Sequence, residues 1–269
     1  MISSLWLLPF IFLIGAVFGS FLNVMVIRSL SGEQFLWGRS HCDSCQRELE
    51  WYELLPLISF FMLRGKCRTC HTPIDVMHPV VELLTASLFV WWFGIGFAFF
   101  QLTIQPLSII QPLFWLIVGV LFLYILLTDL QAFFIPDFAI LSLALLTLLY
   151  RSVLIGFGIY DPQSLAWALF GASLALAAFL FLWLITRGQG MGFGDVKLVF
   201  ALGLLLEWPN VVVGLFLGFV YGAVIGVSLL VMNKVRFGMA IPFAPFLLAG
   251  TVTALIWGDS LVRWYLQML

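Results

Sequence analysis

Long uninterrupted runs of apolar residues set the strongest limit on how this chain can fold. A helix needs roughly 20 apolar residues to cross the hydrocarbon core of a bilayer. Eight candidate spans can be placed, the sixth of them short and expected to extend into its flanking turns. They are residues 5–27, 79–100, 109–128, 138–157, 164–186, 196–207, 211–232 and 241–266. We therefore expect an all-α polytopic membrane protein with about eight transmembrane helices, solvated mainly by membrane lipid.

Composition agrees with this class and excludes others. The 269 residues are 63% hydrophobic and only 9% charged, whereas a soluble domain carries about 25% charged residues. The net charge of −1 and the absence of a lysine-rich run give no indication of a nucleic-acid partner. No internal repeat is visible.

The distribution of basic residues predicts the orientation. Residues 1–27 contain no Lys or Arg, whereas a cleaved signal peptide would have a basic stretch before its apolar run. We therefore expect a retained first span with its N-terminus outside. Cytoplasmic loops are enriched in Lys and Arg. With the segment 29–78 inside, only Arg151 and Arg263 of the 12 basic residues fall outside.

This layout predicts three parts of the chain. Residues 1–28 form the first transmembrane helix, 29–78 a small cytoplasmic segment, and 79–269 a transmembrane core. The cytoplasmic segment contains all four cysteines and all three histidines.

The cysteines predict a metal site. Cys42 and Cys45 form one CxxC pair, and Cys67 and Cys70 form a second after 21 intervening residues. Paired knuckles of this kind supply four thiolates to a structural zinc ion. On the reducing side of the membrane, two disulfides are a poor alternative. Four incidental buried thiols remain an alternative, as does replacement of one ligand by a neighbouring histidine: His41, His71 or His78.

Three acids near the ends of spans on the cytoplasmic side are candidates for chemistry. They are Asp129, Asp137 and Asp195. Asp137 follows Pro136 at the start of a span, which predicts a role as an N-terminal helix cap. Ionisable groups at membrane depth are expensive and are therefore functional candidates. Glu53, in the polar segment, is expected to be a surface acid near the membrane face, with substrate binding as the alternative.

Asp129 and Asp195 form the candidate catalytic pair. Two carboxyls in a partly dehydrated site cannot both ionise easily, so one can activate water while the other donates a hydrogen bond to a peptide carbonyl. The glycines of residues 190–194 favour close backbone approach and a hinge rather than phosphate binding, because no β-strand precedes them. The alternative is that both acids are interfacial charges, or ion pairs with Lys197 and Arg187.

Six stretches spread over nearly the whole chain are together highly specific. They are Gly19–Val24 (GSFLNV), Trp51–Cys70 (WYELLPLISFFMLRGKCRTC), His78–Thr85 (HPVVELLT), Asp129–Asp137 (D-x7-D with Pro before the second acid), Met191–Leu198 (MGFGDVKL, a GxGD motif) and Ile241–Phe246 (IPFAPF). In these stretches the sequence resembles the type IV prepilin peptidase family, whose members are bifunctional leader peptidases and N-methyltransferases.

The resemblance implies a reaction. Members of the family cleave the basic leader of type IV prepilins and type II secretion pseudopilins after a glycine, at the cytoplasmic face of the bacterial inner membrane. The two catalytic aspartates of the family match Asp129 and Asp195. The new N-terminal residue is then methylated with S-adenosylmethionine, which implies a role for the segment 29–78 in methyl transfer.

The departures from the family pattern bear on methylation more than on proteolysis. Asp43, His78 and Ala244 replace residues common in the family, and the stretch from Arg28 to Cys42 is short. A protease without methyltransferase activity is therefore the alternative. By resemblance, candidates near a methyltransferase site are Gly19, Asn23, Arg28, Glu53 and Glu82.

Two other classes of function compete. A proton or cation transporter would place acids deep within spans and often contain inverted repeats, whereas these acids cluster at one face. An assembly subunit of a secretion apparatus would use the zinc segment for docking and would tolerate substitution of both aspartates.

Overall fold

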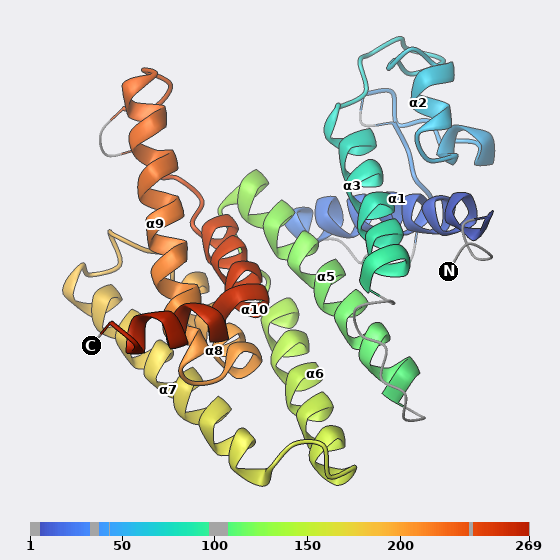
Figure 1. The fold of residues 1–269 in the computed structure, drawn as a ribbon. Helices are drawn as coiled ribbons and strands as arrows, with labels where there is room; N and C mark the ends of the chain where they lie inside the picture. Colours follow the sequence, from blue (N-terminus) through green and yellow to red (C-terminus); the bar gives the residue numbers. More distant parts are fainter. Residues whose placement is uncertain (1–5, 33–37, 43, 97–106, 237–238, 269) are drawn as a thin grey trace. The chain divides into compact units, whose positions relative to one another are not determined.

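The computed structural model describes residues 6–32, 38–42, 44–96, 107–236 and 239–268, and most of them are helical (Figure 1). The chain divides into two compact units, Met1–Tyr124 and Ile125–Leu269, with the boundary inside helix α5 (Leu107–Ala132). The described residues form two isolated β-bridges and no β-strand. The all-α class predicted from the sequence is confirmed.

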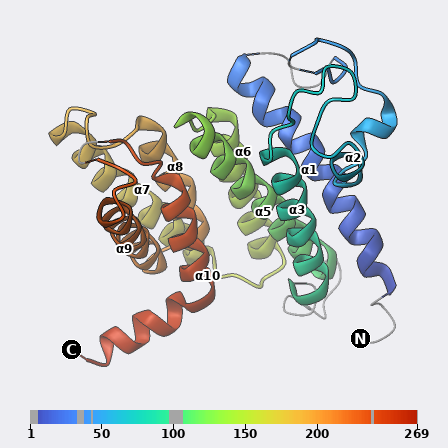
Figure 2. The same ribbon diagram turned by 90° about the horizontal axis from the view of Figure 1, so that it is seen from above.

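Helices α1 (Leu8–Ser31) and α3 (Met77–Trp91) pack tightly together in the first unit (Figures 1 and 2). The close approach depends on two glycines of α1. A Cβ atom at Gly15 would lie 2.7 Å from the Cα atom of Ala86, and one at Gly19 would lie 2.7 Å from the Cα atom of Glu82. Small residues four positions apart let helix backbones approach closely inside membranes.

The rest of the first unit lies around these two helices. The polar segment between α1 and α3 contains the short helices η2 (Trp51–Leu54) and α2 (Ile58–Met62). A π-helical turn, η3 (Trp92–Gly96), follows α3. The hydroxyl of Tyr124, in α5, donates a hydrogen bond of 2.8 Å to the hydroxyl of Ser29 in α1.

The second unit contains the end of α5 and five further helices. These are α6 (Asp137–Gly156), α7 (Pro162–Ile185), α8 (Phe193–Leu206), α9 (Asn210–Val231) and α10 (Ala244–Leu266). Helix α8 is the most buried of them, and every residue from Leu198 to Leu206 except Phe200 is buried. A Cβ atom at Gly203 would lie 2.5 Å from the Cα atom of Ala172 in α7, so only glycine permits this crossing.

Each of the eight predicted spans corresponds to a helix in the described part of the chain. Six are long and apolar enough to cross a membrane, namely those at Leu8–Leu30, Ile110–Ala132, Asp137–Gly156, Pro162–Ile185, Asn210–Val231 and Ala244–Leu266. The remaining two, α3 with 15 residues and α8 with 14, are shorter. Helix α8 begins three residues before the predicted span, as expected for an extension into its flanking turn. The predicted start of the first span at residue 5 and end of the second at residue 100 lie outside the described residues.

Candidate active site and metal centre

Asp195 lies in the first turn of α8, where the partial positive charge of a helix terminus favours an acid. Its backbone N–H donates a 3.2 Å hydrogen bond to the carbonyl of Gly192, the N-cap residue. A Cβ atom at Gly192 would lie 3.3 Å from Oδ2 of Asp195, so the glycine leaves room beside the carboxyl group. The side chain is buried, and its Oδ1 atom has no hydrogen-bond partner among the described residues. A buried acid oxygen without a partner is a candidate for contact with water or substrate.

Asp129 lies in the last turn of α5 and is also buried. Its Oδ2 atom accepts a hydrogen bond of 3.0 Å from the backbone N–H of Ala244, the first residue of α10. The first N–H groups of a helix have no partner inside the helix. This contact therefore gives one N–H donor at the amino end of α10 a hydrogen-bond partner, and it holds the carboxyl group of Asp129 in place.

The fold brings the two acids together within the second unit. Their carboxyl groups are close enough for the charge of Asp129 to act on Asp195. The turn between α5 and α6 packs against the start of α8, since a Cβ atom at Gly194 would lie 3.3 Å from Cβ of Ile135. Two buried, interacting carboxyls can divide the roles of base and acid between them.

The prediction that Asp137 caps α6 is wrong. The N-cap residue is Pro136, with φ −64° and ψ 131°, and no side chain caps this end. Because Asp137 already has helical backbone geometry, its carboxylate projects outward and forms an ion pair with Lys197 of α8. Asp137 is 76% exposed in its side chain. Lys197 thus pairs with Asp137, and not with Asp129 or Asp195 as the alternative interpretation supposed.

The four cysteines form one cluster in the first unit. The Sγ atoms of Cys42, Cys45, Cys67 and Cys70 all lie within 4.8 Å of one another. The Sγ atoms of Cys42 and Cys70 are 3.8 Å apart. A tetrahedral zinc ion with Zn–S bonds of about 2.3 Å requires sulfur atoms about 3.8 Å apart. The cluster therefore fits zinc, and the four thiolates would leave no ligand position open.

The two CxxC pairs share two backbone features among the described residues. The N–H of Cys42 donates to the carbonyl of Arg47, and the N–H of Cys67 donates to that of Thr72, each at 2.9 Å. Gln46 and His71, which follow the second cysteine of each pair, have φ values of 57° and 56°. Backbone N–H groups of Cys70 and Thr69 lower the pKa of the Cys67 thiol to about 6. Ready loss of this proton favours metal binding.

The histidines lie outside the cysteine cluster, and Glu53 is buried. None of the three histidines belongs to the cysteine cluster, so the four-thiolate set is favoured over a mixed one. The prediction that Glu53 is a surface acid is wrong, because Glu53 is buried. Its two carboxylate oxygens accept hydrogen bonds of 2.7 and 2.9 Å from Arg47. Arg47 thereby lowers the pKa of the Glu53 carboxyl group.

Sequence reasoning missed two features of the second unit. One is the N–H donor of Ala244, which no side-chain motif reveals. The other is Arg151, a buried arginine of α6 whose guanidinium donates to the carbonyls of Leu204 and Leu205 at the end of α8. An arginine within an otherwise apolar span was an available signal, because such residues are retained for a partner or a function.

Comparison with known proteins shows the family of this chain. Residues 13–95 match the model of the bacterial peptidase A24 N-terminal domain, and residues 115–227 match that of the type IV leader peptidase family. A Bacillus subtilis (strain 168) protein named prepilin leader peptidase/N-methyltransferase is 31% identical over 265 residues, covering 97% of this chain and 99% of the relative. The chain belongs to the prepilin leader peptidase/N-methyltransferase family.

Other members of this family support the assignment. A relative of the same name from Stutzerimonas stutzeri is 32% identical, covering 94% of this chain and 92% of its own. The one from Aeromonas hydrophila is 36% identical, covering 85% and 74%. No solved structure matches the chain. The resemblance predicted from the sequence is confirmed, and Asp129 and Asp195 both lie within the range of the leader peptidase model.

Proposed function

We propose that this chain is an aspartyl endopeptidase that removes the leader peptide of type IV prepilins or pseudopilins. The single observation that carries the proposal is the buried pair of Asp129, oriented by the N–H of Ala244, and Asp195, whose Oδ1 atom has no partner in the described part of the chain. The names of the relatives supply the substrate class. The cut is expected after a glycine, before the hydrophobic helix of the substrate.

The two carboxyl groups divide the chemistry. The ionised carboxylate takes a proton from a water molecule as that water attacks the scissile carbonyl carbon. The protonated carboxyl donates a hydrogen bond to the carbonyl oxygen, where negative charge develops. The second proton transfer, to the leaving amine, completes the cleavage.

The membrane orientation follows from charge. Of the 12 basic residues, 10 fall on the side that holds the segment 29–78 and both aspartates. From the positive-inside rule we infer that the site lies at the cytoplasmic face of the inner membrane. In this arrangement residues 1–28 are the first span, 29–78 are the zinc-binding segment associated with methyl transfer, and 79–269 are the protease core.

We further propose that the chain methylates the amine released by cleavage. S-adenosylmethionine supplies the methyl group when it is bound, and the relatives' names support this activity. Zinc, held by Cys42, Cys45, Cys67 and Cys70, has a structural role, because a segment this small cannot form a core of its own. A protease without methyl transfer is the alternative.

Cleavage of a detergent-solubilised prepilin by purified protein tests the proteolytic mechanism. Asp129→Asn and Asp195→Asn keep the size and polarity of each side chain but cannot exchange the proton. Both variants should be folded and inactive, with the wild type cutting after the leader glycine. Asp137→Asn is the matched control, because this exposed acid pairs with Lys197 and should be dispensable for cleavage. Cleavage by both Asp129 and Asp195 variants would refute the proposal.

Methyl transfer is tested separately with a labelled methyl group and cleaved pilin. Label on the new N-terminus supports the second activity. Intact proteolysis without label transfer would establish the protease-only alternative.

A further inference from the structure

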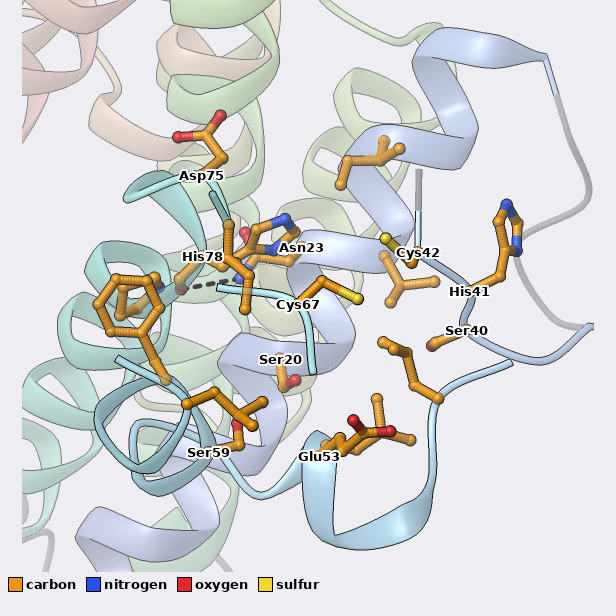
Figure 3. Close-up of a pocket in the computed structure, with 18 of the residues that line it drawn as sticks. Ser20, Asn23, Ser40, His41, Cys42, Glu53, Ser59, Cys67, Asp75 and His78 are labelled. Atoms are coloured by element: carbon orange, nitrogen blue, oxygen red, sulfur yellow. Dashed lines mark hydrogen bonds between the residues drawn. The ribbon is translucent and has the colours of Figure 1, made fainter. Parts of the chain in front are cut away.

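The first unit contains a cavity of about 370 Å³ between α1, α3 and the cysteine segment (Figure 3). Ligand sites typically have volumes of about 300–1,000 Å³ and a few well-placed polar groups on an otherwise apolar wall. All its lining residues belong to the first unit, whereas Asp129 and Asp195 belong to the second, and the peptidase chemistry does not use the cavity. Its polar lining includes Ser20, Asn23, Arg28, Glu53, His78 and Glu82.

The walls of the cavity are fixed by direct contacts between helices. The backbone of α1 at Gly19 lies against Glu82, leaving no room for a Cβ atom. Further along α1, the side-chain amide of Asn23 donates a 3.0 Å hydrogen bond to the carbonyl of His78, at the start of α3. Figure 3 shows this bond at the edge of the cavity, between the two helices. The lining is therefore held in place by packing, as a binding site requires.

Two buried acids line the cavity, and their charges are compensated differently. Glu53 forms an ion pair with Arg47. Glu82 is 8% exposed, and its Oε2 atom accepts a hydrogen bond of 2.7 Å from the backbone N–H of Leu57. It also has a hydrogen bond with Ser20, and His78 is close enough to act on it electrostatically. Among the described residues, no ion pair includes Glu82.

A buried carboxylate is costly unless a cation or several hydrogen bonds compensate it. Glu82 has hydrogen bonds with Leu57 and Ser20, and a cationic ligand in the cavity would add the opposite charge that no ion pair of the described residues supplies. The methyl donor of the proposed function is a sulfonium, which is a permanent cation at the centre of an otherwise neutral nucleoside. Its amino-acid portion also has a carboxylate, and the same lining includes the guanidinium of Arg28, which donates a 3.1 Å hydrogen bond to the carbonyl of Gly38.

We propose that this cavity binds S-adenosylmethionine and that Glu82 faces its sulfonium. The proposal rests on the methyl-transfer half of the proposed function and identifies the cavity as the binding site of the methyl donor. Glu82 forms and breaks no bond in methyl transfer and acts as a positioning residue.

Equilibrium binding to the zinc-loaded full-length protein in detergent tests this assignment. Three probes are compared: S-adenosylmethionine, its analogue sinefungin, which has an ammonium group near the sulfonium position, and S-adenosylhomocysteine, whose sulfur is neutral. The variant is Glu82→Gln, which keeps an acceptor for the N–H of Leu57. Glu48→Gln is the matched control, because this exposed acid of the same segment pairs with Arg39 outside the cavity.

We expect Glu82→Gln to weaken both cationic probes by about tenfold or more, as loss of one partner of a buried charge pair does. Binding of S-adenosylhomocysteine should change much less, and Glu48→Gln should change none of the three. Equal weakening of all three probes, or no weakening, would overturn the role of Glu82. Zinc content and prepilin cleavage must stay at wild-type levels, which shows that the variant is folded.

The experiment separates failure of the site from failure of the function. If the wild type transfers methyl groups while Glu82→Gln binds every probe normally, methyl transfer stands and the cavity assignment is wrong. If the wild type cleaves prepilin but neither binds a probe nor transfers methyl, both the methyl-transfer half of the function and this assignment are wrong.

Discussion

The carboxyl group of Asp129 is held by the backbone N–H of Ala244, a residue 115 positions later in the chain. The acid ends α5 and the donor begins α10, so the contact exists only when both helices are in place. Displacement of a reacting group by about 1 Å can lower the reaction rate by about a hundredfold. The proposed peptidase site therefore depends on α10, although α10 contributes no acid to it.

Enlarging Ala244 should impair cleavage by moving this donor. Ala244 is fully buried, and Ala244→Val adds two methyl groups at this buried position. Overpacking of this kind shifts the backbone at a cost of about 1–3 kcal/mol. We expect prepilin cleavage to fall by about tenfold or more, measured as kcat/KM. Ala249→Val makes the same change on an exposed position of α10 and should leave the rate unchanged. Equal rates for both variants would contradict the dependence on Ala244.

A methyl group at Gly192 should disturb the second acid. The added Cβ atom of Gly192→Ala would lie 3.3 Å from Oδ2 of Asp195, a contact tight enough to turn the carboxyl group away. We expect a loss of cleavage of about tenfold with little change in the unfolding temperature in detergent. Gly156→Ala is the control, because nothing lies within 4 Å of its added Cβ atom. A fully active Gly192→Ala enzyme would show that the space beside Asp195 is not required.

The sequence predicted the helices well because their signal is local. A run of apolar residues predicts a membrane helix from its own length and composition, and six of the helices meet that test in the structure. The cysteine cluster was predictable for a similar reason, since each CxxC knuckle is a local structure and the only unknown was that the two meet. Glu53 and Asp137 were interpreted wrongly because their partners, Arg47 and Lys197, had to be identified from the fold.

The candidate site was predictable only in part. Residue type and the GxGD pattern singled out Asp129 and Asp195, but the donor that orients Asp129 is a main-chain group and has no signature of its own. The cavity beside Glu82 likewise depends on close packing of α1 against α3. Contacts between residues far apart in the chain carry no local pattern, so they emerge only from the packed structure.

Arg151 should be a large contributor to stability. Its guanidinium donates to the carbonyls of Leu204 and Leu205 at 2.9 and 3.2 Å, and it forms a 2.8 Å ion pair with Glu207. These contacts satisfy carbonyls at the carboxyl end of α8, where the last C=O groups of a helix have no partner inside the helix. Arg151→Met should lower the unfolding free energy by about 3–5 kcal/mol, because it leaves buried carbonyls and an acid without their partner.

Thermal unfolding in detergent measures this effect. Arg263→Met is the control, because Arg263 is exposed in the last turn of α10. A double variant, Arg151→Met with Glu207→Gln, should recover part of the loss by removing the unpaired charge. An unfolding temperature for Arg151→Met equal to that of the control would show that α8 is held by apolar packing alone.

Zinc removal should unfold the cysteine segment without abolishing the acid pair. We expect about one zinc ion per chain in purified protein, and none after Cys45→Ser, since a four-thiolate site has no spare ligand. Thr69→Ser, between Cys67 and Cys70, should keep its zinc.

The affinity of the site for zinc should fall as the pH falls, because thiols bind zinc only after losing a proton. With the pKa of Cys67 at about 6, the weakening should steepen below about pH 6. Metal analysis of protein dialysed between pH 7.5 and 5 measures the loss. Full zinc content in Cys45→Ser would show that the ion is held by other ligands.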